Sequence, residues 1–423
     1  MTEFVARLPI ERRLADAGLP PLPRSAWLEI DLDLLRWNLA ALRAALPADV
    51  RLEHVLKADG YGHGAVPVGR ALEAAGADGF SVAAFDEAVE LRAGGIRGPI
   101  LCLYAVPPEL IPEAMRLRVA VAASGERALA RTLAAATDAW TRSAARRPRA
   151  ALRVHLDVET GLGRAGLDPS RAAAAAALVA ATPGAHLAGI WSHLQRSDDR
   201  PRTAAQDERF RAAIGGLVDA VVRLPDRHLA ASAGLLGRVV PAYDGVRVGL
   251  ATYGIVPDDV DPTAAAEPPA SDLRPILSLH ARAVRVADLP AGTGISYGPS
   301  FTTTRPSRIA TLPLGYGDGY PRSLANRAVA LVRGRRAPVV GNVAMDAVMI
   351  DVTDLSGPPV TEDDEFVLLG RQGSDAITVE EVARWRTTNT WETVTAMARR
   401  LPRVYHAGPV LVSLRTLATR GDR

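Results

Sequence analysis

Apolar and polar positions follow a repeating pattern over the first 260 residues, in which short apolar runs are separated by longer amphipathic segments. The longer segments have the helical spacing of apolar residues and lie at 65–75, 85–93, 127–145, 170–181 and 203–223. The short runs are typical of buried strands and lie near residues 52–57, 79–83, 98–103, 118–122, 151–157, 187–193, 228–232 and 246–250. Strands that alternate with helices in this way predict an α/β fold with a parallel (β/α)₈ barrel.

The pattern changes near residue 260, where Asp- and Pro-rich stretches at 258–262 and 267–269 indicate a linker. Arg333-Gly334-Arg335 predicts a hairpin turn. Beyond the linker the pattern predicts strands at 277–287, 307–314, 329–332, 338–343, 347–352 and 365–369, with short helices at 378–384 and 391–399. We therefore expect an N-terminal extension (1–24), a barrel domain (25–262) and a mostly β C-terminal domain (263–423).

Composition narrows the class of protein. The chain has 423 residues, 48% of them hydrophobic and 23% charged, which suits a soluble globular protein with two domains. The net charge is +3 and no basic block is interleaved with aromatic residues, so we expect no nucleic-acid partner. No apolar stretch has the length of a signal peptide core or a membrane span, so we expect a cytoplasmic protein without a membrane partner. Cys102 is the one cysteine, which leaves no disulfide or thiolate metal site within the chain.

The segment Val55-Leu56-Lys57-Ala58-Asp59-Gly60-Tyr61-Gly62-His63-Gly64 is the strongest candidate for chemistry. Lys57 is the only lysine of the chain and stands between an apolar run and a glycine-rich turn. A lysine held at the mouth of a barrel is partly desolvated, and a neutral amine can form a Schiff base with an aldehyde. The glycines would let a phosphate approach the backbone closely. The alternative is a surface lysine before a turn.

Other polar residues fall where barrel strands end, which is where function gathers in this fold. They are Arg164, His193, Ser232, Arg247 and Gly249. Each has a plainer alternative, namely a hydrogen-bonded core histidine, a helix cap or a solvated arginine. Their common position at one rim favours a site.

Three glycine-flanked loops of the second domain carry further candidates. Tyr297 lies in Gly294-Ile295-Ser296-Tyr297-Gly298, and a phenol can act as acid or base. Tyr316 lies in the second loop, and Met345 and Asp346 lie in the third. Tight β-turns would explain each loop singly.

Together these segments resemble the pyridoxal 5′-phosphate-dependent alanine racemases, over about residues 26–402. The resemblance implies the barrel-plus-β fold of type III pyridoxal phosphate enzymes, interconversion of L- and D-alanine, and a cytoplasmic homodimer with shared active sites that supplies D-alanine as a peptidoglycan precursor. It also implies that Lys57 binds the cofactor as a Schiff base and is the base on the D-face. Tyr297 would be the base on the L-face, contributed by the other subunit.

The resemblance assigns the remaining site residues as well. Arg247 would face the pyridine nitrogen, and because a guanidinium keeps its protons the ring nitrogen would stay unprotonated. His193 resembles the histidine that orients this arginine. Arg164, Met345 and Tyr316 match positions at the substrate carboxylate, the catalytic tyrosine and the entrance, and Asp346 follows Met345 in the matching motif. The phosphate-binding positions match Tyr61, Ser232, Gly249 and Leu250.

Three positions depart from the family pattern. Many members carry a carbamylated lysine seven residues before the equivalent of Arg164, where this chain has Asp157, and we expect the aspartate to take over that role. Ala231 stands where asparagine often precedes the serine. Arg399 aligns with a phosphate-binding tyrosine. No metal is implied.

Alternative functions remain at this stage. A racemase of another small amino acid such as serine needs only a changed pocket wall. A decarboxylase on the same architecture would place a carboxylate at the ring nitrogen, which Arg247 argues against. A non-catalytic pyridoxal phosphate-binding barrel would lack the second domain and Tyr297.

Overall fold

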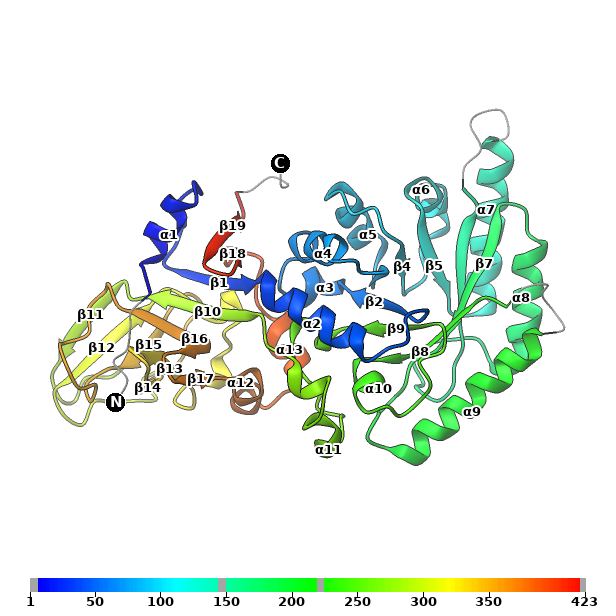
Figure 1. Cartoon of the computed structure of the whole chain (residues 1–423). Coiled ribbons are helices and arrows are strands. Elements are labelled where there is room, and N and C mark those ends of the chain that lie inside the picture. Colours follow the sequence, from blue (N-terminus) through cyan, green and yellow to red (C-terminus); the bar gives the residue numbers. More distant parts are fainter. Residues whose placement is uncertain (1–6, 144–149, 219–223, 419–423) are drawn as a thin grey trace. The chain divides into compact units, whose positions relative to one another are not determined.

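The computed structural model describes residues 7–143, 150–218 and 224–418, and contacts divide the chain into two units. One unit contains residues 35–60 and 65–274. Its eight parallel strands form a closed barrel in sequence order, which confirms the predicted (β/α)₈ fold (Figure 1). The strands are β2 (Arg51–Val55), β3 (Gly79–Val82), β4 (Ile100–Cys102), β5 (Val119–Ala123), β6 (Leu152–Asp157), β7 (Ala185–Trp191), β8 (Asp226–Ala231) and β9 (Gly245–Val248).

Helices connect the barrel strands and lie around them (Figure 1). Their buried faces are rich in alanine and leucine, which combine high helix propensity with apolar contact. They are α2 (Leu32–Ala44), α4 (Ala65–Ala74), α5 (Phe85–Ala93), α6 (Ile111–Leu117), α7 (Glu126–Ser143), α8 (Ala172–Ala181) and α9 (Arg200–Leu217), with the short α3 (Lys57–Tyr61), α10 (Ser232–Leu236) and α11 (Pro262–Ala265) at strand ends and in the linker.

The other unit contains residues 1–34, 61–64 and 275–423 and is mostly β, as predicted. Its larger sheet has the order β14-β13-β16-β10-β1-β18-β19, with β17 paired to β16, and a second sheet has the order β11-β12-β15. The strands are β1 (Ala26–Asp31), β10 (Leu277–Arg282), β11 (Arg285–Leu289), β12 (Ser307–Leu312), β13 (Val329–Val332), β14 (Arg335–Pro338), β15 (Val348–Asp351), β16 (Glu365–Gln372), β17 (Asp375–Ile377), β18 (Arg403–Ala407) and β19 (Val410–Arg415), with helices α12 (Val379–Arg386) and α13 (Thr390–Thr395).

Several predicted boundaries differ from the structure. The strand predicted at 338–343 is wrong, because the Arg333-Gly334 turn pairs β14 with β13 and leaves only an isolated bridge at Val339. The run 277–287 forms two strands, β10 and β11. Residues 144–145 and 219–223 of two predicted helices lie outside the described residues. The predicted domain boundaries at residues 24 and 262 stay a prediction. Strand β1, which follows the first of these boundaries, pairs with β10 and β18 of the β-rich unit.

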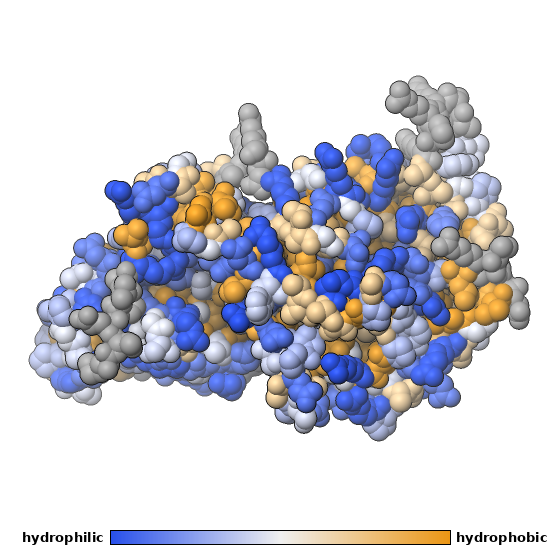
Figure 2. All heavy atoms as spheres, in the orientation of Figure 1, coloured by the Kyte–Doolittle hydropathy of each residue, from blue (hydrophilic) through white to orange (hydrophobic). Residues whose placement is uncertain are grey.

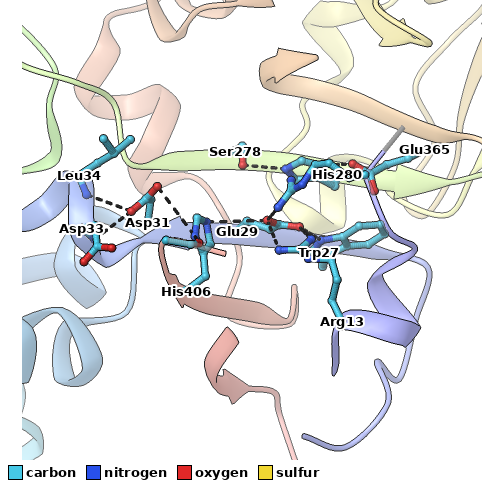
Figure 3. Close-up of polar contacts among 12 residues, drawn as sticks. Arg13, Trp27, Glu29, Asp31, Asp33, Leu34, Ser278, His280, Glu365 and His406 are labelled. Atoms are coloured by element: carbon cyan, nitrogen blue, oxygen red, sulfur yellow. Dashed lines mark hydrogen bonds and ion pairs between the residues drawn. The ribbon is translucent and has the colours of Figure 1, made fainter. Parts of the chain in front are cut away.

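The N-terminal extension is anchored on a buried carboxylate of the β-rich unit (Figure 3). Trp27 and Glu29 point to the same face of β1, and the Trp27 indole N–H donates to Glu29 at 3.1 Å. Arg13, on α1 (Ile10–Asp16), donates two hydrogen bonds to the same carboxylate at 2.7 and 3.1 Å, and Arg7 donates a third at 2.9 Å. Burial alone would raise the pKa of Glu29, but His280 and the arginines hold it well below its usual range.

Apolar contacts support the same anchor. Ile10 and Leu14 of α1 are buried with Trp27, and the last two strands complete the cluster with Val404, Leu411 and Leu414. Over the face of the molecule in Figure 2, hydrophilic side chains predominate and hydrophobic ones are interspersed among them. Among the described residues, no helix combines the length and the apolar character that a membrane crossing requires.

Candidate functional site

Lys57 begins a short left-handed turn at the carboxyl end of β2. Ala58, Asp59 and Gly60 have φ values of 53°, 56° and 61°, a region that costs non-glycine residues about 1–2 kcal/mol each. Glu87 of α5 offsets part of this cost, because its carboxylate accepts the Ala58 N–H at 2.6 Å and the N–H groups of the β3–α5 loop at 2.8 and 3.0 Å. The turn is therefore held rigidly at the rim where the sequence predicts chemistry.

The two glycines after this turn are required for packing, and the expected close approach of a phosphate to this segment stays a prediction. A Cβ at Gly62 would lie 2.4 Å from the carbonyl oxygen of Val394, and one at Gly64 would lie 1.9 Å from the hydroxyl oxygen of Tyr405. Tyr61 belongs by its contacts to the same β-rich unit, and burial raises the pKa of its phenol well above the usual range. Its predicted phosphate contact stays a prediction.

Lys57 lies in surroundings that favour the neutral amine. Burial lowers the pKa of Lys57, and the positive charges of Arg164 and Arg247 lower it further, while Glu87 opposes them. The barrel fold thus brings Lys57, Arg164 and Arg247 into one electrostatic environment. A lysine whose pKa is lowered by burial and by two arginines suits a nucleophile or a base.

Arg247 of β9 is buried with 3% of its surface exposed and is fixed from several sides. Its guanidinium donates to the carbonyl oxygens of Ser192 at 2.7 Å and His228 at 3.0 Å, and it lies over the Trp191 ring at 4.7 Å from the centroid. Burial lowers the pKa of Arg247 to about 10, which leaves the group charged at neutral pH. The result is a pre-oriented cation inside the barrel.

Two histidines lie against Arg247, and sequence reasoning identified only one of them. The predicted partner His193 lies 3.5 Å from the guanidinium, whereas His228 Nδ1 lies 2.5 Å away. Burial lowers the pKa of His193 to about 3 and that of His228 well below its usual value, so neither is charged at neutral pH. His228 lies inside an apolar strand, where a single histidine looks like a core residue.

Ser232 and Gly249 form a second feature of the same rim. The Ser232 hydroxyl at the start of α10 accepts the N–H groups of Gly249 at 2.9 Å and Ala251 at 3.3 Å. Leu250 is buried directly after Gly249 and begins a 3₁₀ turn that runs to Tyr253. The predicted residues Ser232, Gly249 and Leu250 therefore lie together.

The loop that carries Arg164 is held by the carboxylate of Glu159, a residue of the same loop. Glu159 accepts the backbone N–H groups of Gly161 at 2.5 Å, Gly163 at 2.9 Å and Arg164 at 3.3 Å. The guanidinium of Arg164 lies over the Tyr104 ring at 5.6 Å from its centroid. The backbone of the loop is thus fixed while the side chain stays available.

Asp157 is a buried acid at the end of β6. Burial raises its pKa to about 6, against the opposing effects of Ser124, Arg164 and Arg247. The carboxylate therefore interacts with the charge of Arg164 across the site, and its predicted role of holding Arg164 stays a prediction.

The β-rich unit brings its three predicted loops together. The Asn342 amide donates to the carbonyl oxygens of Tyr297 at 2.8 Å and Gly298 at 3.1 Å, and Tyr316 N–H donates to Ala344 at 3.1 Å. A Cβ at Gly315 would lie 2.0 Å from the Ala344 carbonyl oxygen, so close loop packing requires glycine there. The tight turns of these loops therefore also bring the three loops into contact with one another.

A buried carboxylate anchors these loops. Asp318 accepts from Gly315 N–H at 3.0 Å, from Arg24 at 2.7 Å and from Arg400 at 2.7 and 2.9 Å. Arg400 also forms a short ion pair with Asp346. The side chains that the loops present are exposed, with Tyr297 at 79%, Met345 at 52% and Tyr316 at 46%. Arg399, the neighbour of Arg400, is also exposed.

Comparison with protein families matches nearly the whole of this architecture. The family described as "Alanine racemase, N-terminal domain" matches residues 30–257, and "Alanine racemase, C-terminal domain" matches residues 276–405. The curated alanine racemase of Symbiobacterium thermophilum is 42% identical over 388 residues, which cover 90% of this chain and 97% of that protein. That of Syntrophobacter fumaroxidans is 38% identical, with 90% and 98% covered.

Solved structures agree with the sequence comparison. Alanine racemase from D-cycloserine-producing Streptomyces lavendulae has a TM-score of 0.81 and 37% identity, over 92% of this chain and 98% of that one. Alanine racemase from Bacillus anthracis with bound L-Ala-P has a TM-score of 0.84 and 30% identity, over 94% and 99%.

Proposed function

The chain belongs to the alanine racemase family, and from this premise we propose that Lys57 and Tyr297 are the two opposed bases of its reaction. It is an isomerase that interconverts L- and D-alanine and depends on pyridoxal 5′-phosphate. The observation that carries the proposed assignment is the setting of Lys57, the only lysine of the chain, whose pKa is lowered by burial and by two arginines.

The residues at the barrel rim suit this cofactor by their chemistry. Lys57 supplies an amine for the aldehyde, and Arg247 supplies an obligate donor for the ring nitrogen. Ser232, with the backbone around Gly249 and Leu250, supplies a hydroxyl and N–H groups for a phosphate, and we assign Tyr61 to the same group. When bound, pyridoxal phosphate withdraws electrons from the α-carbon of the amino acid and makes its proton removable.

Inversion at the α-carbon requires proton transfer on both faces. In the proposed direction from D- to L-alanine, the neutral ε-amine of Lys57 takes the α-proton from one face, and the Tyr297 hydroxyl gives a proton to the other. The reverse direction exchanges the two roles. A lysine with its usual pKa of about 10.4 would be protonated at neutral pH, so the lowered pKa of Lys57 favours the base form.

Arg247 would limit how far negative charge spreads into the ring of the bound cofactor. A guanidinium donates and cannot accept, so we assign it the role of keeping the ring nitrogen unprotonated. This role of Arg247 would make a bound ring a weaker electron sink and would disfavour side reactions such as transamination. A decarboxylase of this architecture would instead place a carboxylate at the ring nitrogen, and Arg247 argues against that function.

We assign the substrate carboxylate to Arg164 and to the backbone N–H of Met345, and the entrance to Tyr316. Arg164 supplies a guanidinium for the carboxylate, and we assign Asp157 the negative charge that balances it. Asp346 supports the third loop through its ion pair with Arg400.

The proposal requires at least a homodimer, in which Tyr297 of the partner subunit completes the site around Lys57. The exposed side chains of Tyr297, Met345 and Tyr316 support it, because large exposed apolar groups clustered on fixed loops are typical of interfaces. A cytoplasmic location and a supply of D-alanine for peptidoglycan belong to the same proposal and rest on the family.

One experiment tests the function and its substrate range. The protein is incubated with pyridoxal phosphate and a panel of L-amino acids, and the products are separated by chiral chromatography. We expect D-alanine as the main product and a smaller yield of D-serine. Faster racemisation of another amino acid would overturn alanine as the preferred substrate.

A further inference from the structure

Two buried imidazoles extend from Arg247 into the barrel. His228 Nδ1 lies 2.5 Å from the Arg247 guanidinium, and His228 Nε2 lies 2.9 Å from Nδ1 of His155 on β6. The His155 and His228 rings meet edge to face with centroids 5.2 Å apart, and His228 stacks on Trp191 at 6.2 Å. Arg247, His228 and His155 therefore form one chain of polar contacts inside the barrel unit.

The chemistry of arginine fixes the direction of this chain. A guanidinium has only donors, so His228 Nδ1 must be the acceptor and carry no proton. Burial keeps His228 neutral, so its single proton is on Nε2 and is donated to His155 Nδ1. His155 is kept neutral by burial as well, with a pKa of about 3, so its own proton is on Nε2.

The barrel is built to seat the His155 ring. A Cβ at Gly189 of β7 would lie 2.1 Å from His155 Nδ1, so no other residue type fits beside the imidazole in this position. His155 is 4% exposed and also lines a cavity of about 50 Å³ with Arg51 and Glu53, which is large enough for water. Water or a carboxylate in this cavity can accept a hydrogen bond from the Nε2–H group of His155.

We propose that His155 is a positioning residue that selects the tautomer of His228 and, through it, fixes the direction in which Arg247 points. Without an acceptor at its Nε2, His228 can place its proton on Nδ1, where it opposes the N–H groups of Arg247. The guanidinium then loses its 2.5 Å contact and can rotate. The inference rests on the proposed role of Arg247 at the ring nitrogen.

The tautomers are measured directly in the wild-type holoenzyme. Nitrogen-15 NMR of histidine-labelled protein separates protonated from unprotonated ring nitrogens. Because the chain has 8 histidines, single His155→Asn and His228→Asn variants assign the signals. We expect Nδ1 unprotonated and Nε2 protonated for both residues at pH 7. A proton on Nδ1 of His228 would overturn the proposed direction of this chain of polar contacts, and this result is independent of whether the racemase assignment holds.

A pair of variants tests the effect on the site. His155→Asn keeps an acceptor oxygen near the position of Nδ1, whereas His155→Leu removes it at similar size. We expect His155→Leu to shift the absorbance maximum of the bound cofactor and to lower kcat by about tenfold, as one buried donor left unpaired predicts. We expect His155→Asn to restore most of both.

The control is His54→Leu, which removes another buried imidazole from the barrel, one that contacts Thr252 at 2.9 Å. It should lower the melting temperature without moving the cofactor absorbance. Equal absorbance for His155→Leu and wild type, or equal kcat losses for His155→Leu and His155→Asn, would overturn the positioning role. If His155→Leu does not fold, Gly189→Ala displaces the ring without replacing it and carries the same expectation.

Discussion

The barrel rim and the loops of the β-rich unit hold their candidate residues in opposite ways. At the rim, Arg247 is 3% exposed and contacts β7, the residues that follow it, and β8, and Lys57 has its pKa lowered by its surroundings. In the loops the backbone is fixed by Asp318 and Asn342, yet Tyr297 is 79% exposed. The rim sets the charge states of its residues by burial, whereas the loops set only their positions.

This difference predicts how each region responds to substitution. A change at the rim alters groups that are already desolvated, so it changes pKa values and orientation within one unit. A change at an exposed loop residue leaves the fold unaffected and acts only on what that residue contacts in the assembled enzyme.

Lys57→Ala removes the only lysine, and we expect racemase activity to fall by about 10³-fold or more because both the cofactor attachment and one base are lost. Borohydride reduction followed by mass spectrometry should find no cofactor adduct in this variant and one adduct, on Lys57, in the wild type. A reduced adduct on any internal residue of the variant would remove Lys57 from its role.

Tyr297→Phe should lower activity by about 10²- to 10³-fold, because a phenyl ring cannot transfer a proton. The melting temperature should not change, since the hydroxyl lies on an exposed side chain. The matched control is Tyr243→Phe, whose hydroxyl contacts Asp207 on the outer helix α9. It should keep activity.

Mixing the two inactive variants tests whether the site is shared. A heterodimer of Lys57→Ala and Tyr297→Phe subunits contains one intact site, so random exchange should restore about a quarter of the wild-type activity. Absence of recovery under conditions of proven subunit exchange would count against a site made by two subunits.

Asp318→Asn should destabilise the β-rich unit by about 3 kcal/mol, because Arg24 and Arg400 lose a buried partner. Activity should fall with it as the Tyr316 loop loosens. Asp346→Asn is the control, since it removes the exposed partner of the same Arg400 and should cost about 1 kcal/mol or less. Urea unfolding of both variants measures the difference, and equal losses would contradict Asp318 as the anchor.

Asp157→Asn should stabilise the protein at neutral pH and cause only a modest loss of activity. The folded pKa of about 6 lies above the usual 3.8, so the favourable contribution of Asp157 is complete below pH 4 and is lost as pH rises through 6. The variant avoids this loss, and its melting temperature should exceed that of the wild type by more at pH 8 than at pH 4. Its kcat/KM should fall several-fold if the charge balances Arg164, and full activity would contradict that role.

Local pattern predicted the barrel well because parallel strands are buried on both faces and form continuous apolar runs. Each of the eight barrel strands overlaps its predicted run. The β-rich unit was predicted less well because antiparallel pairing depends on turns. The run at 338–343 is apolar, yet the Arg333-Gly334 turn pairs the more polar Arg335–Pro338 segment with β13. Helix α6 was not predicted, since prolines interrupt its start.

For the site, the sequence by itself determined the types and order of the reactive groups. Lys57 is the only amine that a side chain offers, and its glycine turn and the three tyrosine- and methionine-bearing loops are readable as motifs. Tertiary structure alone decided that Gly62 and Gly64 make room for Val394 and Tyr405, and that His228 rather than His193 makes the shorter contact with Arg247. The reason is physical, because steric fit, burial and hydrogen-bond direction depend on residues far apart in the chain.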